Sequence, residues 1–190
     1  MSNVSRVIPS GFTLIEVLVS LLIFSVGLLG CAGLQGRAQQ AQKEAYQSAY
    51  AINMMTDMLS LIRANNDARG CYQLGNAELG VGYSKTYECT AHGEEEGQQR
   101  AAEDINQWSD LLQGVGTVNG SGNVGGLLNA RGCIEFDGAL NSYVVSVVWQ
   151  GLVESGTSNA SCGEGLYGGT GNSLRRLVSG TFVAPNLDGS

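Results

Sequence analysis

The chain has 190 residues, of which 43% are hydrophobic and 28 are glycine. That length fits one domain of ordinary size, and a glycine content of about twice the average favours strands and turns over helices in the second half. Lys+Arg 10 against Asp+Glu 17 gives a net charge of −7. An acidic chain without clustered cations argues against binding to nucleic acid or adsorption to anionic lipid.

An apolar stretch from Phe12 to Gly30 follows a short polar segment, residues 1–11, that carries one cation. A stretch of this length can cross the hydrocarbon core of a bilayer, about 30 Å thick, as one helix. Glu16 is its one ionisable residue, and a carboxylate at that depth costs about 2.5–3.5 kcal/mol on insertion scales. Glu16 is either an interfacial residue of a span that begins at Val17, part of a proton or ion relay, or a residue that pairs with a partner.

The junction favours the third interpretation. Gly11 followed by Phe12-Thr13-Leu14-Ile15-Glu16 and an unbroken apolar helix resembles the class III signal of type IV prepilins and of type II secretion pseudopilins. The resemblance is strongest over residues 11–35, although the leader has one basic residue where several are usual. It implies that prepilin peptidase cuts between Gly11 and Phe12 and methylates the new amine of Phe12. The resulting ammonium of one subunit would offset Glu16 of a neighbour, so that Glu16 sets the axial register of assembly.

A rival motif lies inside the same helix. Leu28-Leu29-Gly30-Cys31 resembles a bacterial lipobox, in which the cysteine is lipidated and the chain is cut before it. The alternative is a free cysteine that packs as a small hydrophobic residue. The leader and Glu16 both suit a lipoprotein signal badly, and the apolar pattern continues past Cys31.

The helical pattern continues beyond the apolar stretch. Steps of three and four join Leu34, Ala38, Ala41, Ala45, Ala49, Ile52, Met55, Leu59 and Ile62. This spacing predicts an amphipathic helix that runs to about Asn66, where turn residues cluster, and that packs one stripe on a globular domain. A step-three series of glycines, at 27, 30, 33 and 36, indicates either a face for close helix packing or a pliable hinge.

These patterns predict a leader (residues 1–11), a transmembrane and assembly helix (12–34), its amphipathic continuation (35–66) and a globular head (67–190). In the head, the acidic run Glu94-Glu95-Glu96 is interpreted as a solvated loop. Residues 101–113 suit a short helix and 114–126 a glycine-rich connector. Strands are expected over Ile134–Phe136, Tyr143–Gln150 and Leu174–Val183. The expected fold class is α+β: a long helix packed on a small antiparallel sheet, as in type IV pilins.

Four cysteines lie in the head, and such a number in a loop-rich exported domain suggests two disulfides. Three pairings are possible, and we favour neighbours, Cys71 with Cys89 and Cys133 with Cys162. Each bridge would contribute about 3 kcal/mol on the chain-entropy model. A zinc site is the weaker alternative, because the chain has no Cys-x-x-Cys pair.

Nothing in the sequence supports catalysis. The single histidine, His92, lacks partners at ligand spacing. The segment Gly163–Gly168 fits G-x-G-x-x-G by letter, but it sits between strands beside a cysteine and is interpreted as a turn. We therefore expect no enzyme activity, no metal, no cofactor and no small-molecule substrate.

Three segments extend the family resemblance. Residues 27–35 (Gly-Leu-Leu-Gly-Cys-Ala-Gly-Leu-Gln), Val148-Trp149-Gln150-Gly151 and Leu174-Arg175-Arg176-Leu177 resemble the PilV family of minor pilins, the type IV pilus modification proteins. The resemblance implies a non-catalytic subunit of a complex that primes pilus assembly and sits at the filament tip.

The partners it implies are other minor pilins and the major pilin through the N-terminal helix, and prepilin peptidase. Whether a tip adhesin also docks on the head is left open. The implied location is the inner membrane before assembly and the cell surface afterwards. The alternatives are a type II secretion pseudopilin and, from another class, a lipidated cell-envelope binding protein. An exported enzyme ranks third.

Overall fold

The structure is a computed structural model, and it describes residues 11–75, 77–115, 118–119, 122–123, 126–156, 158–168 and 170–185. The expected leader, apart from Gly11, and part of the expected connector at 114–126 lie outside the described residues. The chain divides into two compact units, Met1–Gln42 and Lys43–Ser190.

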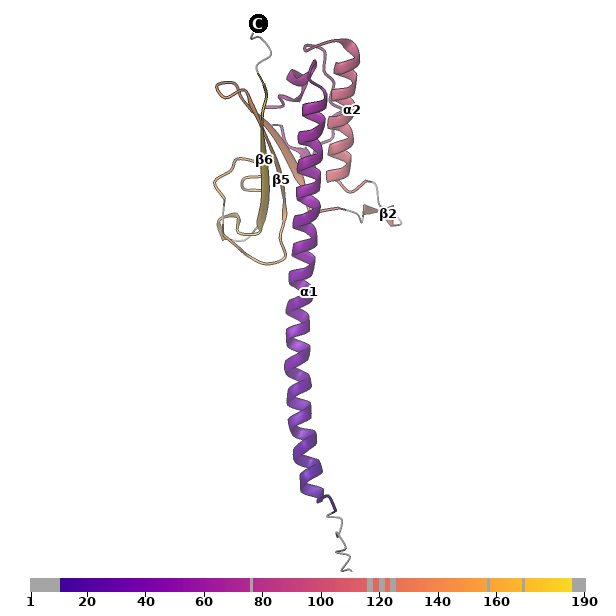
Figure 1. Ribbon diagram of the computed structural model, residues 1–190, viewed down its shortest axis with the longest axis vertical. Helices are drawn as coiled ribbons and strands as arrows, with labels where there is room; N and C mark the ends of the chain where they lie inside the picture. The colour runs from indigo at the N-terminus through magenta and orange to yellow at the C-terminus, as the bar shows by residue number, and fades with distance from the viewer. Residues whose placement is uncertain are drawn as a thin grey trace, which may run out of the picture. The chain divides into compact units, whose positions relative to one another are not determined.

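One long helix, α1, runs from Leu14 to Ala64 (Figure 1). The predicted bounds, Phe12 to about Asn66, are confirmed to within two residues at each end. No proline interrupts the segment, Glu16 lies in the first turn and Arg63 in the last, which suits the helix dipole at both ends. Every described residue of the first unit is exposed in the isolated chain.

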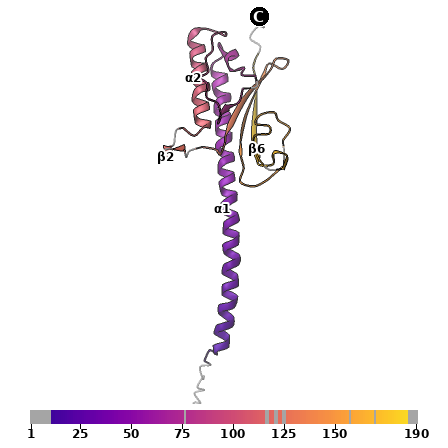
Figure 2. The same ribbon diagram turned by 180° about the vertical axis from the view of Figure 1, so that it is seen from behind.

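The second unit contains the end of α1, a second helix and a sheet (Figures 1 and 2). After α1 the elements are η1 (Arg69–Tyr72), β1 (Leu79–Gly80), α2 (Glu95–Leu112), β2 (Val118–Asn119), β3 (Gly122–Asn123), β4 (Arg131–Asp137), β5 (Ser142–Gln150), η2 (Thr170–Asn172) and β6 (Arg175–Val183). Four strands form an antiparallel sheet in the order β1-β4-β5-β6, and β2 pairs with β3. The three predicted strands and the α+β class are confirmed.

The acidic run was misassigned to a loop. Glu94 is the residue before α2, and Glu95 and Glu96 lie in its first turn. Negative side chains are favoured there by the helix dipole. The carboxylate of Asp67 also accepts a hydrogen bond from the main-chain N–H of Glu94 at 2.7 Å. The helix therefore begins at Glu95 rather than near residue 101.

The phase of the predicted stripe on α1 was partly wrong. The buried residues of α1 are Ala51, Met54, Met55, Met58, Leu59 and Ile62. Ile52 is 44% exposed, and Ala45 and Ala49 are also exposed. The buried face is wider and shorter than predicted because both α2 and the sheet pack on the last four turns of the helix.

Ala45 and Ala49 belonged to the predicted stripe, but the structure leaves both exposed. Met55, Leu59 and Ile62 are the members of that stripe that the structure buries. Met54 and Met58 complete the buried face, because a helix surface covered on two sides needs apolar residues at adjacent positions as well as at steps of three and four.

The head has two apolar clusters, one on each face of the sheet. The larger cluster lies between α1, α2 and the sheet, and its largest fully buried side chains include Trp108, Tyr72 and Met58. The smaller cluster lies on the opposite face and consists of Cys133, Val148, Cys162 and Tyr167, with Leu177 packed against them. The long loop between β5 and β6 therefore covers part of the sheet's outer face.

Candidate functional site

The predicted cut site lies immediately before α1. Gly11, Phe12 and Thr13 are outside the helix and exposed, and the Phe12 side chain is 82% exposed. A Cβ built on Gly11 would meet no atom within 4 Å. Both residues that flank the predicted cut are thus exposed, and no described residue requires a glycine at position 11.

Glu16 lies one turn into the same segment. Its main-chain N–H donates to the carbonyl of Thr13 at 3.1 Å, which makes it part of the first turn of α1. The side chain is exposed, and no ion pair joins it to another of the described residues. The Ser20 hydroxyl donates to the main-chain carbonyl of Glu16 at 2.6 Å, a local bond that leaves the carboxylate available.

The helix that carries Glu16 is long and apolar enough to cross a membrane. Its most apolar window has a mean hydropathy of 2.5, lies near the N-terminus and has none of its residues buried. Large side chains such as Leu14, Leu22 and Leu29 are 78%, 66% and 74% exposed. An apolar surface this continuous is stable only in lipid or against other helices.

The rival lipidation residue, Cys31, is a free, exposed cysteine within α1. The helix passes through it and through the four glycines around it without a break. A Cβ on Gly27, Gly30, Gly33 or Gly36 would meet nothing within 4 Å. The isolated chain therefore offers a smooth, narrow helix surface at these positions, which suits close approach of another helix.

One ion pair fastens α1 to the sheet and to the loop after β5. The Glu44 carboxylate lies 3.1 Å from Nη2 of Arg176, and the same oxygen accepts the Leu152 N–H at 3.2 Å. Nη2 of Arg176 also donates to the Val153 carbonyl at 2.7 Å. The Leu-Arg-Arg-Leu segment noted in the sequence thus contributes Arg176 to a joint between helix and loop.

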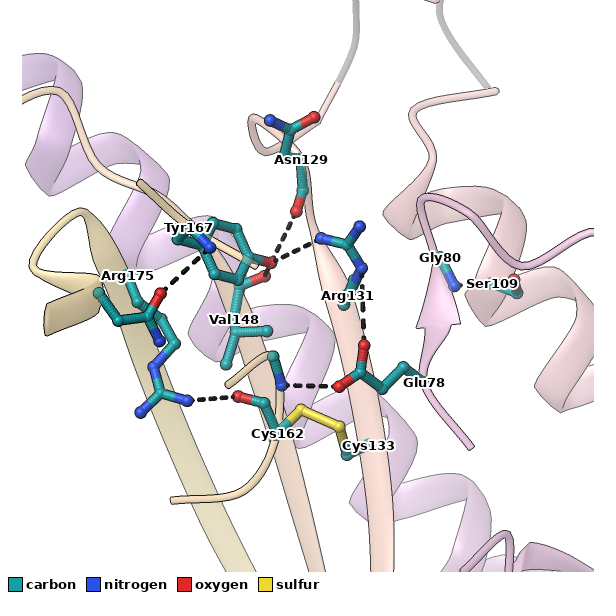
Figure 3. Close-up of polar contacts among 12 residues, drawn as sticks. Glu78, Gly80, Ser109, Asn129, Arg131, Cys133, Val148, Cys162, Tyr167 and Arg175 are labelled. Carbon is teal, nitrogen blue, oxygen red and sulfur yellow. Dashed lines mark hydrogen bonds and ion pairs between the residues drawn. A yellow bond between two sulfur atoms is a disulfide. The ribbon is translucent and has the colours of Figure 1, made fainter. Parts of the chain in front are cut away.

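The two disulfides are Cys71–Cys89 and Cys133–Cys162, the neighbouring pairs favoured from the sequence. The second bridge ties β4 to the outer loop (Figure 3). Beside it, the guanidinium of Arg175 donates to the carbonyls of Ala160 and Cys162, both at 2.8 Å, and to that of Ser158. Arg175 is 5% exposed, so a buried cation holds this loop through main-chain oxygens.

Tyr167 anchors the other side of the loop, as Figure 3 shows. Its hydroxyl donates to the Asn129 carbonyl at 2.7 Å and accepts from Nη1 of Arg131 at 3.5 Å. Arg131 pairs with Glu78 at 3.6 Å, and Glu78 in turn accepts the Gly163 N–H at 2.9 Å. Burial raises the pKa of Tyr167, so the hydroxyl keeps its proton well into the alkaline range.

The polar cluster of Glu78, Arg131, Tyr167 and Arg175 holds the loop between β5 and β6 in place. Arg175 donates to main-chain carbonyls and Arg131 pairs with Glu78. No group of three or more His, Cys, Asp or Glu side chains in the described ranges could hold a metal ion. Sequence analysis did not find Glu78, Arg131 or Tyr167, because contacts between side chains and distant main-chain groups leave no spacing pattern. His92 lies in the loop before α2, where its ring approaches Gly70.

Two protein-family models match consecutive segments of the chain. Residues 9–32 match the prokaryotic N-terminal methylation motif. Residues 33–105 match the family described as type IV pilin Tt1218. No curated protein and no solved structure gives a significant match.

The fold and the motif together define a class of filament-forming subunits with a processed N-terminal helix. The chain belongs to the type IV pilin superfamily. Members of this superfamily are structural subunits.

Proposed function

We propose that the chain is a minor pilin of a type IV pilus, taking part in the complex that initiates assembly and sits at the tip. One observation carries the proposal: Gly11, Phe12 and Glu16 lie at the exposed start of α1, whose most apolar window has no buried residue. The resemblance to the PilV family over residues 27–35 supports the minor-pilin assignment.

The proposed processing follows from that arrangement. Prepilin peptidase removes residues 1–11 and methylates the amine of Phe12. Residues 12–34 hold the subunit in the inner membrane until it enters the filament, residues 35–66 join this segment to the rest, and residues 67–190 form the head.

The proposed assembly contact is electrostatic. The ammonium of Phe12 in one subunit pairs with Glu16 of the next, within a bundle of apolar helices. A buried carboxylate without a partner costs about 3–5 kcal/mol, so only the matching axial register is stable. The partners are other minor pilins and the major pilin, and a tip adhesin is a further candidate.

The second candidate is a type II secretion pseudopilin, which shares the motif. The large head with two disulfides favours the pilus, because the pseudopilins usually have smaller heads. A lipoprotein modified at Cys31 would lose residues 1–30, including Glu16, and would leave the methylation motif without a use.

Quantitative mass spectrometry of pili sheared from cells tests the proposal. We expect peptides of the head in the sheared pili, in an amount much smaller than that of the major pilin. Replacing Gly11 by a bulky residue (Gly11→Phe) should remove these peptides from the sheared pili. Gly138→Ala, in a surface turn of the head, serves as the control and should not change the amount. Detection of the chain only in the cell envelope would contradict the proposal.

A further inference from the structure

Two arginines converge on one phenylalanine ring in the head. Arg63 lies in the last turn of α1 and Arg69 lies in η1. Their Cζ atoms are 4.8 Å and 5.4 Å from the centroid of the Phe182 ring, which comes from β6. Three separate elements thus bring two cations to one half-buried aromatic surface, which we call the Arg63–Arg69–Phe182 site.

The two charges lack acidic partners within the described part of the chain. The ion pairs there join Arg100 to Glu96, Arg131 to Glu78, and Arg176 to Glu44. No carboxylate of the described residues forms an ion pair with Arg63 or Arg69 within 4.0 Å. The C-terminal carbonyls of α1 supply only about half a negative charge, which offsets one guanidinium in part.

Arg69 also has unused hydrogen-bonding capacity. Its Nη2 donates to the side-chain carbonyl of Asn66, a neutral acceptor. Its Nε is buried and has no partner among the described residues. A buried donor without a partner costs free energy, and a guanidinium that turns toward a bound acceptor would recover that cost.

The floor of the site is held in place by neighbouring aromatic residues. Phe136, Tyr143 and Phe182 are register partners across β4, β5 and β6. The rings of Phe136 and Tyr143 lie 4.8 Å apart, and the Tyr143 hydroxyl donates to the main-chain carbonyl of Arg69 at 3.1 Å. The backbone that carries Arg69 is therefore fixed before any ligand binds.

We propose that the Arg63–Arg69–Phe182 site binds an Asp or Glu side chain of another pilus subunit. Guanidinium groups match the planar carboxylate through paired hydrogen bonds, and the ring offers an apolar surface for the methylene groups beside it. The proposal rests on the proposed function for the identity of the partner as a pilus subunit. The recognition chemistry rests only on the geometry of these three residues.

Charge selects a protein carboxylate over an extended polyanion. The chain carries a net charge of −7, and the exposed acidic residues Glu94, Glu95 and Glu96 belong to the same head. A phosphate-rich surface would bring many negative charges into this negative field, whereas one side chain on a protein segment brings a single carboxylate to the two cations. An anionic lipid is therefore an outcome of the test that would contradict the proposal.

Site-specific photo-crosslinking in living cells tests the proposal with the full chain. We replace Phe182 by p-benzoylphenylalanine, which keeps an aromatic ring at the site, and identify crosslinked peptides by mass spectrometry. We expect a crosslink to a peptide of another subunit within a few residues of an Asp or Glu. Adding Arg63→Gln and Arg69→Gln should lower the yield by about tenfold or more, since each charge-assisted hydrogen bond contributes on that order to affinity.

Matched variants separate recognition from folding. Arg100→Gln removes an equal charge from the exposed face of α2 and should leave the yield unchanged. Arg63→Gln alone changes an exposed side chain, so it should preserve the head and still lower the yield. Arg63→Lys keeps the charge and should restore part of it.

A yield that does not respond to Arg63→Gln and to the double substitution, a crosslink to a segment without carboxylates, a lipid adduct or no adduct would each overturn the proposal. The N-terminus of the same sample is read in parallel. Arginine-dependent crosslinking of a chain that lacks methylated Phe12 would contradict the proposed function and leave the carboxylate site standing. Methylated Phe12 with arginine-independent crosslinking would give the reverse result.

Discussion

The indole Nε1 of Trp108 donates a hydrogen bond to the main-chain carbonyl of Met54 at 3.1 Å. Trp108 lies on α2 and is 1% exposed, and Met54 lies on the buried face of α1. The bond joins the two helices at a point where the sheet also approaches, because a Cβ on Gly132 of β4 would lie 2.2 Å from Cη2 of Trp108. Three elements therefore meet at one tryptophan.

Gly132→Ala should destabilise the head by about 1–3 kcal/mol, the usual cost of overpacking a core. The new methyl group would overlap the Trp108 ring and lie 2.8 Å from Cδ1 of Leu112. Gly138→Ala is the control, because its Cβ would meet only Cε1 of Phe136 at 3.7 Å, an ordinary contact. Urea unfolding of the detergent-solubilised chain, followed by tryptophan fluorescence, measures both. Equal midpoints for the two variants would contradict the assigned contact.

The joint between Glu44 and Arg176 should contribute measurably to stability. We expect Glu44→Gln to cost about 1 kcal/mol, because the oxygen accepts from both Arg176 and the Leu152 N–H in a partly shielded place. The matched control is Glu96→Gln, whose pair with Arg100 is largely exposed and should contribute close to zero. The same urea titration decides, and a larger loss for Glu96→Gln would refute the comparison.

Buried tyrosines should make the head sensitive to alkaline pH. Burial raises the pKa of Tyr72, Tyr87, Tyr143 and Tyr167 above the ordinary tyrosine value of 10.0. The unfolded chain then releases protons near pH 10 that the folded chain retains, so the stability contributed below pH 10 is lost as the pH rises above it. Tyr72→Phe should reduce this slope, and a free energy of unfolding that stays constant from pH 9 to pH 11 would contradict the account.

Glu16→Ala should still be cut after Gly11 but should enter pili poorly, because the Phe12 ammonium of the neighbouring subunit would lose its partner. The expected decrease in sheared pili is about tenfold or more, given the cost of an unpaired buried charge. Ser20→Ala, one turn further along α1, removes only a local hydroxyl and serves as the control. Normal incorporation of the Glu16→Ala chain would refute the register hypothesis.

Sequence reasoning predicted the elements whose residues repeat at a regular step. The length of α1 and the strand Tyr143–Gln150 follow from apolar periodicity and from β-branched composition. The acidic start of α2 was missed because a run of three glutamates looks like a solvated loop unless the helix dipole is considered. The phase of the buried face of α1 could not be read from one helix, since α2 and the sheet decide together which side is covered.

Contacts between distant residues were beyond the sequence. Nothing in the sequence connects Trp108 with Met54, or Arg63 and Arg69 with Phe182, because these pairs form only after three elements have packed. The adjacent pair Arg175-Arg176 was noticed as a basic dipeptide, but the two side chains make different contacts. Arg175 holds the outer loop, and Arg176 joins α1 to the sheet.

The N-terminus of the mature chain tests the central claim most directly. Intact mass and N-terminal sequencing of the protein isolated from membranes should give a chain that begins at methylated Phe12. A chain that still carries residues 1–11, or one that begins at Cys31 with a diacylglycerol, would contradict the account.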